Sequence, residues 1–400
     1  MIKSGEFELI PYGRQEITQS DIDEVVSVLK SDFITQGPQV PAFERMIAEK
    51  VGAKYAVASS SATSALHLAC RALNVQVGDV VWTSPITFVA SANCALYCGA
   101  EVDFVDIDRS TCNMCVSTLE LKLEKAKKIG RLPKVVIPVH FGGQSCDMAR
   151  IKQLSEVYGF SVIEDASHAI GAQYKGASVG CCLYSDITIF SFHPVKIITT
   201  GEGGMALTNE TYLADTMRIL SSHGITRNPE EMDCEPDGPW YYQQVALGFN
   251  YRMTDIQAAL GISQAKRLSD YVRRRNELAD IYDQSFRSLP VTPVGRSSDS
   301  YSAFHLYVIR IGRDLGQDAR KLIYDYLQKE NIRVNVHYIP VHLQPWYRQF
   351  GFTKTMFPEA ERYYEEAISL PMFPTLSDDE QQRVIQAVAG AVDKVQRGKR

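Results

Sequence analysis

Long apolar runs and blocks of like charge are absent from this 400-residue sequence. No window holds the ~20 uninterrupted apolar residues that a membrane span requires, and the N-terminal segment MIKSGEFELIPYGRQ lacks the apolar stretch of a signal peptide. The net charge of −5 comes from interspersed acids and bases, so no basic face is expected to neutralise a nucleic-acid backbone. We therefore expect a globular cytoplasmic protein that binds neither membrane nor nucleic acid.

Metal-binding spacings are equally scarce. The nine cysteines are an odd number and are scattered through apolar segments, so we expect reduced thiols rather than disulfides. Cys112 and Cys115 form one CxxC, but no second pair lies at zinc-finger distance and the surrounding turn is not thioredoxin-like. No metal site is expected.

What the sequence does contain is a regular alternation of short β-rich runs with helical patterns, from Lys54 to about Thr208. This alternation is typical of a mainly parallel sheet that is covered by helices on both faces. Residues 62–73 and 150–158 carry apolar side chains at helical spacing and are predicted to be crossover helices. Seven strands are expected, at Lys54–Ala58, Val80–Trp82, Val102–Val105, Val135–Val139, Ser161–Glu164, Ile187–Phe190 and Gly204–Leu207.

The pattern changes beyond Gly248, where two long helices are expected before a Pro- and Ser-rich stretch at residues 289–300. A smaller α+β unit is predicted after that stretch. We place a large α/β domain at residues 1–262 and a small C-terminal α+β domain at residues 263–400. The elements expected in this half are helices at 254–266, 268–286 and 319–330, strands at 305–311 and 333–337, and a closing helix from Ser377.

A lysine and an acid follow two of the expected strands: Asp165 comes after SVIE and Lys196 after ITIFSF. The carboxyl ends of parallel strands open onto one edge of the sheet, so both side chains can point into one crevice. A lysine desolvated there has a lowered pKa and can form a Schiff base, while the carboxylate can pair with a pyridinium nitrogen. The ordinary alternatives are a surface lysine and a helix N-cap. His168, one turn after Asp165, fits a structural role as well as a functional one.

Small hydroxyl residues stand where the first crossover helix begins. Ser61 and Thr63, in SSSATSALHL, lie at a helix N-terminus, where free backbone N–H groups and the helix dipole favour a phosphate. Considered alone, they are more simply an ordinary N-cap. The nearby lysine and acid favour the phosphate site.

Seven motifs occur in an order typical of one protein family: TQGPQVPAFE, SATSALHLA, SPITFVASAN, EDASHAIGA, SFHPVKIITTGEGG, GFNYRMTDIQAALG and VHYIPVH. From about Tyr12 to Pro371 the sequence resembles the sugar aminotransferases of the DegT/DnrJ/EryC1/StrS group. The resemblance implies the fold of a PLP-dependent transferase (pyridoxal phosphate; aspartate aminotransferase, fold type I). Such a fold has a mainly parallel seven-stranded sheet and a smaller C-terminal α+β domain.

The resemblance also implies a role for each matching residue. Lys196 resembles the lysine that forms the Schiff base with PLP and then carries the proton between substrate and cofactor. Asp165 would be the partner of the pyridine nitrogen. The other implied cofactor contacts are Ala62, Thr63 and Ser191 at the phosphate, Phe88 stacked on the ring, His168 at the ring hydroxyl, and Asn250 reaching the phosphate from a neighbouring subunit. Without this context Phe88 would more simply be a core residue. The implied active unit is a homodimer with shared active sites.

Within the group, the forms DFITQG, SATSAL, DASHA and VHYIP particularly resemble the aminotransferases of pseudaminic acid synthesis. Those enzymes convert a UDP-linked 4-keto-6-deoxy-N-acetylhexosamine of L-configuration, UDP-2-acetamido-2,6-dideoxy-β-L-arabino-hexos-4-ulose, to the 4-amine. The contacts to the sugar nucleotide implied by this resemblance are Tyr12, Asp32, Phe33, Ile34, Thr35, Val336, His337, Tyr338 and Ile339.

The expected reaction has two stages, in which L-glutamate converts PLP to pyridoxamine phosphate and the ketosugar then takes the amine. Three alternatives remain open at this point. The first is an aminotransferase for another dTDP-, UDP- or GDP-linked keto sugar. The second is a pyridoxamine-phosphate-dependent sugar dehydratase, although such relatives resemble this group with His at the position of Lys196. The third is a PLP-binding regulator that has lost turnover.

Overall fold

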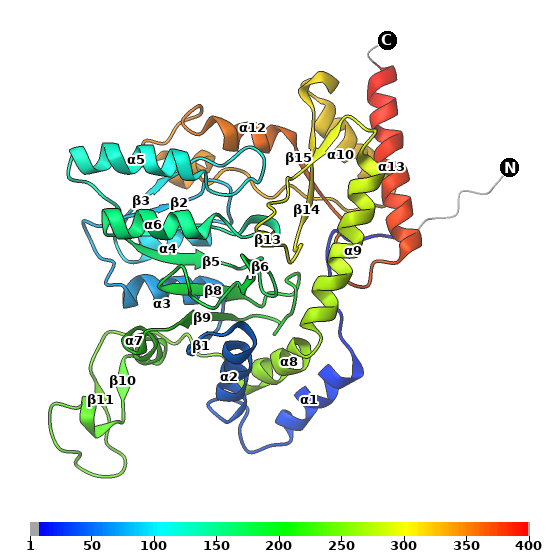
Figure 1. Cartoon of the computed structure of the whole chain (residues 1–400). Helices are drawn as coiled ribbons and strands as arrows, with labels where there is room; N and C mark the ends of the chain where they lie inside the picture. The colour runs from blue at the N-terminus through cyan, green and yellow to red at the C-terminus, as the bar shows by residue number, and fades with distance from the viewer. Residues whose placement is uncertain (1–7, 399–400) are drawn as a thin grey trace.

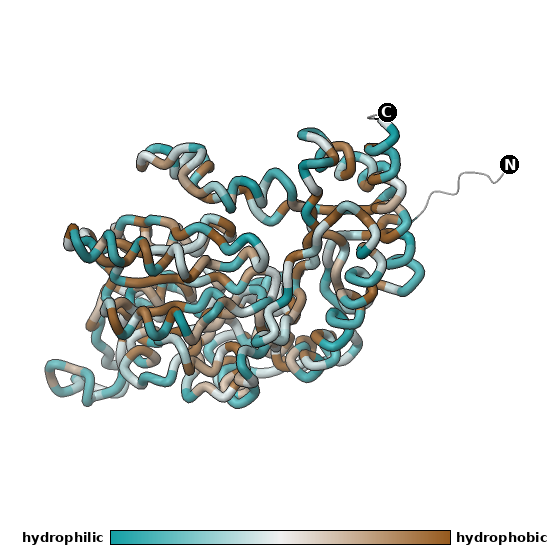
Figure 2. Tube along the Cα trace, turned by 45° about the horizontal axis from the view of Figure 1, so that its top comes forward, coloured by the Kyte–Doolittle hydropathy of each residue, from teal (hydrophilic) through white to brown (hydrophobic). Residues whose placement is uncertain are grey.

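The computed structural model describes residues 8–398. Residues 1–7, part of the N-terminal segment that we expect not to be a signal peptide, lie outside this range. The chain folds into a wide sheet covered by helices, with a smaller sheet-and-helix unit beside it (Figure 1). Hydrophobic residues concentrate along the inner strands, while hydrophilic residues dominate the outer turns of the helices (Figure 2). None of the helices in the described range is long and apolar enough to cross a membrane.

The large sheet has seven strands in the order β1-β9-β8-β5-β4-β2-β3. All neighbouring strands are parallel except β9, which runs antiparallel to both β1 and β8. The predicted mainly parallel seven-stranded sheet is therefore confirmed, and each predicted strand overlaps an observed one. The strands are β1 (Tyr55–Ser59), β2 (Val80–Thr83), β3 (Glu101–Phe104), β4 (Val135–Ile137), β5 (Ser161–Asp165), β8 (Ile187–Ser191) and β9 (Gly204–Thr208).

Helices cover both faces of this sheet. One face packs against α3 (Ala62–Ala72), α4 (Ala90–Tyr97) and α7 (Thr211–Ser221), and the other against α5 (Val116–Lys128) and α6 (Met148–Tyr158). The central strands are buried on both faces, which explains their nearly continuous apolar sequences. Beside the β1 end of the sheet lie α1 (Gln19–Leu29), α2 (Gln39–Val51) and α8 (Asp255–Ala265).

The small unit contains an antiparallel sheet in the order β12-β14-β15, formed by β12 (Val291–Pro293), β14 (Tyr307–Ile311) and β15 (Ala367–Leu370). A core of its own joins this sheet to α9 (Leu268–Phe286), α10 (Ala319–Lys329) and α13 (Asp378–Arg397). Ser377 caps α13 in a capping box with Glu380, as its spacing predicts. The boundary between residues 262 and 263 stays a prediction.

The remaining elements are short. They are α11 (Pro345–Arg348), α12 (Pro358–Glu366), the pair β10 (Ile225–Thr226) and β11 (Gln243–Gln244), and a three-stranded sheet of β6 (Gln173–Tyr174), β7 (Ala177–Ser178) and β13 (Ser300–Tyr301).

The strand predicted at residues 333–337 is wrong. Only Asn335 forms an isolated bridge there, to Ser369 in β15, and β15 occupies the place beside β14. The Asn335 side chain accepts the backbone N–H of Val336 at 2.8 Å, which competes with a strand ladder. Conversely, β12 lies inside the Pro- and Ser-rich stretch at residues 289–300, which the sequence predicts to be a boundary between domains. Pro293 is tolerated there because β12 is an edge strand.

Candidate active site

A cavity of about 560 Å³ opens at the carboxyl ends of the parallel strands, where the large sheet faces the small unit. This is the edge at which α/β proteins bind ligands, and the volume suits a cofactor with part of a substrate. Its walls come from distant parts of the sequence. They include the start of α3, the segment before α4, the ends of β5 and β8, and the segments around His305 and Tyr338.

Lys196 lies in this cavity on the turn that follows β8, with its backbone N–H bonded to the carbonyl of His193 at 2.9 Å. Desolvation lowers the pKa of its amine to about 8, although the negative charge of Asp165 partly opposes the shift. The amine Nζ lies 3.4 Å from Nε2 of His305. The shift increases the fraction of Lys196 that is a neutral amine near physiological pH, which is the form that acts as a nucleophile or a base.

Asp165 ends β5 and is 5% exposed. Its Oδ2 accepts a hydrogen bond of 2.5 Å from Oγ of Ser91, whose hydroxyl lies 2.7 Å from that of Thr87. Its Oδ1 accepts the backbone N–H of Ser167 at 3.1 Å. These bonds fix the carboxylate in one orientation while the cavity side remains open for a cationic ligand group.

His168 is held as a neutral ring. Its Nδ1 accepts the backbone N–H of Gly142 at 3.3 Å, so Nε2 carries the proton and faces the hydroxyl of Tyr338 at 3.1 Å. Burial, together with the charge of Lys196, lowers the pKa of His168 well below its usual value. The ring can therefore present a hydrogen bond to a ligand oxygen without adding a charge.

The N-terminus of α3 points its first residues into the cavity. Ser61 caps the helix by accepting the N–H of Ser64 at 3.1 Å, which leaves the N–H groups of Ala62 and Thr63 at the first turn, where α-helices have no internal acceptors. Gly204 lies directly against this turn, because a Cβ there would collide with the backbone of Ser61 and Ala62. Ser191, at the end of β8, adds a hydroxyl to the same cavity. This arrangement fits a phosphate.

Most of the residues proposed from the sequence meet in this cavity: Tyr12, Ala62, Thr63, Phe88, Asp165, His168, Ser191, Lys196, Val336, His337 and Tyr338 line it. The others do not line it. Asp32–Thr35 form an exposed loop bridged to Thr254, Ile339 is 45% exposed, and Asn250 is exposed beside Ser222.

Sequence reasoning missed several residues that line or support the cavity, among them Ser91, His305 and Asn335. Ser91 lies one helical turn after Phe88 in SPITFVASAN, and this spacing could have paired it with the Asp165 site. His305 was assigned to the start of a strand, but β14 begins at Tyr307 and His305 stands in the preceding loop. Asn335 was assigned to the strand that the structure lacks. No sequence signal distinguishes His305 from an ordinary loop histidine.

The comparisons with known proteins agree with this geometry. The model of the DegT/DnrJ/EryC1/StrS aminotransferase family matches residues 15–389. The chain belongs to this family. Its nucleotide-sugar aminotransferases use PLP, and this chain is a PLP-dependent enzyme of that kind, with the fold of PLP-dependent aminotransferases.

Three similar proteins illustrate the membership in the DegT/DnrJ/EryC1/StrS family. The spore coat polysaccharide biosynthesis protein SpsC of Bacillus subtilis is 41% identical over 387 residues, which cover 96% of this chain and 97% of SpsC. A UDP-4-amino-4,6-dideoxy-N-acetyl-β-L-altrosamine transaminase of Campylobacter jejuni is 36% identical, covering 98% of this chain and 99% of the transaminase. The structure of Helicobacter pylori PseC, an aminotransferase involved in the biosynthesis of pseudoaminic acid, has a TM-score of 0.89 and 31% identity, covering 97% and 100% of the two chains.

The cavity of this family member fits PLP by its own chemistry. The amine with a lowered pKa suits the aldehyde of PLP, and the fixed carboxylate suits its ring nitrogen. The helix N-terminus suits its phosphate. Among residues 8–398 no group of three or more His, Cys, Asp or Glu side chains is arranged to hold a metal ion.

Proposed function

We propose that the chain transfers the amino group of L-glutamate to the 4-keto carbon of a UDP-linked 4-keto-6-deoxy-N-acetylhexosamine, as in pseudaminic acid synthesis. The observation that carries this proposal is the joint position of Lys196 and Asp165 in a cavity that His168, His337 and Tyr338 also line. Support for the particular sugar comes from the near full-length similarity to the Campylobacter transaminase and to PseC. A cytoplasmic location is part of the same proposal.

PLP, when bound, supplies an electron sink for the carbon that loses a proton. Asp165 would hold the proton on the ring nitrogen, and the first turn of α3 with Thr63 and Ser191 would bind the phosphate. Lys196 would take the proton from the donor carbon and deliver it to the cofactor carbon, and in the second stage it would carry a proton from the cofactor carbon to the sugar carbon. A pKa of about 8 suits both directions. Phe88, which lines the cavity and is 59% exposed, would stack on the cofactor ring and exclude water.

The small unit would supply sugar contacts. His337 has a pKa lowered to about 4, chiefly by burial, and its Nδ1 lies 2.8 Å from Oγ of Ser369. It is therefore a neutral hydrogen-bonding group near pH 7. Tyr12 lies beside it, with ring centroids 5.5 Å apart, and both face the cavity. We propose that Tyr12, His337 and Tyr338, with Val336 and Ile339, bind the sugar and that Asp32–Thr35 bind the nucleotide.

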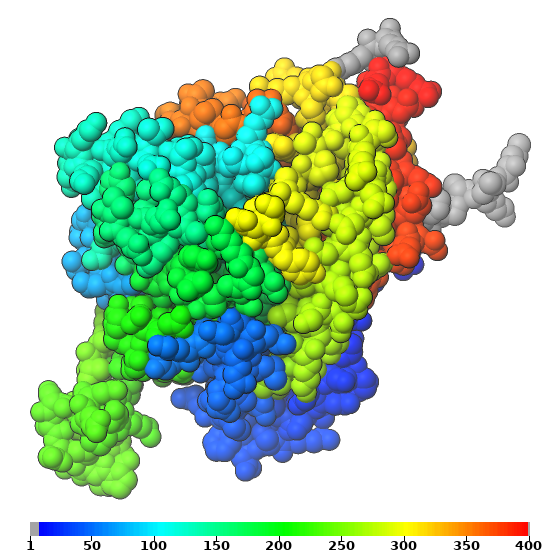
Figure 3. Space-filling view, in the orientation of Figure 1, coloured from blue at the N-terminus to red at the C-terminus, as the bar shows by residue number. Residues whose placement is uncertain are grey.

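A homodimer with shared active sites is also part of the proposal. Asn250 is exposed and does not line the cavity of its own chain, which suits a residue that acts on a second copy. The segment between β10 and β11 projects from the body (Figures 1 and 3). It carries Trp240 at 70% exposure and Tyr242 at 51%, and Leu247 just beyond β11 is 79% exposed. Large apolar side chains exposed together favour a protein contact.

One observation favours a second candidate. SpsC, a spore coat polysaccharide biosynthesis protein, shares more identity with this chain than the Campylobacter transaminase does, 41% against 36%. The chain would then aminate a different nucleotide-linked keto sugar with the same cavity. The dehydratase alternative receives no such support, because the position that carries His in those relatives is Lys196 here.

The two candidates are separated by a substrate panel. Purified enzyme loaded with PLP would be given UDP-, dTDP- and GDP-linked 4-keto sugars with L-glutamate, and each product identified by mass and NMR. The proposal predicts a UDP-linked 4-amino-4,6-dideoxy-N-acetyl sugar of L-configuration. Turnover of another sugar alone would support the second candidate. Release of a deoxygenated product without amine transfer would contradict both candidates.

A further inference from the structure

His305 occupies the cavity without a role in the chemistry described so far. The residue is 5% exposed and comes from the loop that precedes β14 in the small unit. Its ring contacts two residues that follow strands of the large sheet: Nε2 is 3.4 Å from Nζ of Lys196, and the ring centroid is 4.5 Å from that of His168. A side chain of the small unit therefore contacts the reactive amine.

We propose that His305 is a positioning residue for Lys196, whose amine it holds over the cavity by accepting a hydrogen bond at Nε2 while that amine carries the substrate proton. The proposal rests on the proposed function only for the statement that Lys196 is the reactive amine. It needs no particular sugar or donor.

The surroundings of His305 keep its ring neutral. The groups that act on it are Lys196, His168, Arg275 and His337, and each of them is either cationic or a further imidazole. Burial, followed by these charges, lowers the pKa of His305 well below its usual value. His305 consequently cannot take the proton from Lys196, and the proton remains on the lysine for delivery to the substrate.

The second ring nitrogen of His305 is unpaired within the described part of the chain. With Nε2 as acceptor, Nδ1 carries the proton, yet this buried atom has no hydrogen-bond partner among residues 8–398. An unpaired buried donor is destabilising, so the hydrogen bonds of His305 alone do not account for the position of its ring. His342, which lies outside the cavity, also leaves Nδ1 without a partner among the described residues, so the proposal rests on the contact with Lys196 and the packing against His168.

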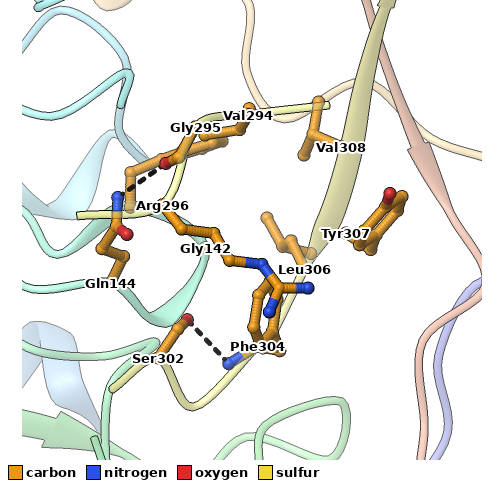
Figure 4. A pocket seen from close by; sticks show the side chains of 11 residues that line it. Gly142, Gln144, Val294, Gly295, Arg296, Ser302, Phe304, Leu306, Tyr307 and Val308 are labelled. Carbon is orange, nitrogen blue, oxygen red and sulfur yellow. Dashed lines mark hydrogen bonds between the residues drawn. The ribbon is translucent and has the colours of Figure 1, made fainter. Parts of the chain in front are cut away.

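Hydrogen bonds and a cation–π contact hold the loop that carries His305 from both sides. Behind it, the buried guanidinium of Arg275 donates to the carbonyls of Phe304 at 3.1 Å, His305 at 3.4 Å and Met372 at 2.9 Å. On its outer side, Ser302 Oγ accepts the N–H of Phe304 at 3.1 Å, and the guanidinium of Arg296 lies 4.7 Å from the Phe304 ring (Figure 4).

The space beside Ser302, Phe304 and Arg296 is too small for a second ligand. The cavity drawn in Figure 4 has about 30 Å³, which is room for one water molecule. A loop fixed this firmly can position a side chain to within the tolerance that proton transfer requires.

Two substitutions of His305 distinguish positioning from packing. His305→Gln places an amide oxygen near the site of Nε2, whereas His305→Asn places its amide near the site of Nδ1. We expect His305→Asn to slow the proton-transfer half reaction with L-glutamate by about tenfold to a hundredfold, to enlarge the isotope effect with α-deuterated glutamate, and to leave KM within about twofold. His305→Gln should recover the rate to within about threefold of the unsubstituted enzyme.

His342 provides a matched control. It is also fully buried, its Nε2 lies 3.1 Å from Glu361 and its Nδ1 has no partner among the described residues, but it does not line the cavity. His342→Asn and His342→Gln should lower the Tm without changing the isotope effect. Equal rates for the two His305 variants, or an isotope effect that follows the Tm in both sets, would overturn the proposal.

A measurement on the protein without cofactor tests the same contact independently of turnover. Nitrogen-15 NMR of the eight labelled histidines, with His305 assigned through His305→Gln, should show an unprotonated Nε2 and a protonated Nδ1 at pH 7. The Nε2 signal should shift in Lys196→Met. A charged imidazolium of His305 at pH 7, or an Nε2 signal that does not shift in Lys196→Met, would contradict the proposal. Loss of activity in Lys196→Met with an unchanged His305 signal would leave the proposed function intact and remove only this inference.

Discussion

The carboxylate of Asp165 is held by Ser91, whose hydroxyl donates to Oδ2 at 2.5 Å and lies 2.7 Å from the hydroxyl of Thr87. This chain of hydroxyls links the end of β5 to the start of α4. It fixes the direction of the carboxylate before any ligand arrives. The orientation of the group proposed to meet the cofactor nitrogen thus depends on two residues from a different crossover of the sheet.

Replacing Ser91 tests this arrangement. Ser91→Ala removes a hydrogen bond to a charged group, which typically contributes about 1.5–3 kcal/mol. We expect the Kd for PLP to rise about tenfold or more while the far-UV circular dichroism stays unchanged. Ser285→Ala, which alters an exposed hydroxyl on α9, serves as the control and should leave the Kd unaltered. Equal PLP affinity in the two variants would show that Asp165 needs no support from Ser91.

The lowered pKa of Lys196 predicts its reactivity in the protein without cofactor. Competitive acetylation followed by mass spectrometry should find half-maximal reactivity of Lys196 near pH 8, below the ordinary lysine value of 10.5, because desolvation disfavours the ammonium form. A midpoint at the ordinary value would mean that water reaches the amine freely.

The same shift predicts a pH dependence of stability. Between the folded pKa of about 8 and the unfolded value of 10.5, the unfolded chain binds more protons, so the free energy of unfolding rises with pH in that window. Lys196→Met should raise the stability of the protein without cofactor at pH 7 by ~1–2 kcal/mol after allowance for solvent screening. It should also flatten the rise between pH 8 and 10. Urea titrations at several pH values measure both effects.

Gly204 tests the site proposed for the phosphate. A Cβ at this position collides with the backbone of Ser61 and Ala62, so Gly204→Ala must displace the first turn of α3. We expect weaker binding of PLP and of inorganic phosphate, together with a lower Tm. In Gly390→Ala the new Cβ meets only the hydroxyl end of Tyr326, and no loss of phosphate affinity is expected. Retained phosphate affinity in Gly204→Ala would place the phosphate elsewhere.

A mixture of two inactive variants tests the shared active site. If Asn250 acts on a second copy, Asn250→Ala mixed with Lys196→Ala should regain activity through hybrid dimers that contain one intact site. Mass spectrometry of the intact assemblies would confirm that subunits have exchanged. No recovery after confirmed exchange would mean that each chain completes its own site, and the proposed role of Asn250 would fail.

The large sheet could be predicted because its strands are apolar, short and separated by helical patterns. The small unit was harder, and residues 333–337 show why. Their β-rich pattern predicts a strand, but the Asn335 side chain takes a backbone N–H that a ladder would need, and the segment turns to face the cavity. Here local hydrogen bonding outweighs β-propensity, and the sequence pattern does not reveal which interaction wins.

The sequence by itself determined the family, through the resemblance of seven ordered motifs, and the large sheet, because apolar strands alternate with helical patterns. It also placed Lys196 and Asp165 at strand ends that open onto one edge of that sheet. Only the tertiary structure decided that Ser91 orients Asp165, that His305 reaches Lys196, and that Asn250 lies outside its own cavity. These relationships join residues 74 and 109 positions apart, and such contacts depend on how separate elements pack in space. Periodicity and spacing describe only neighbours along the chain.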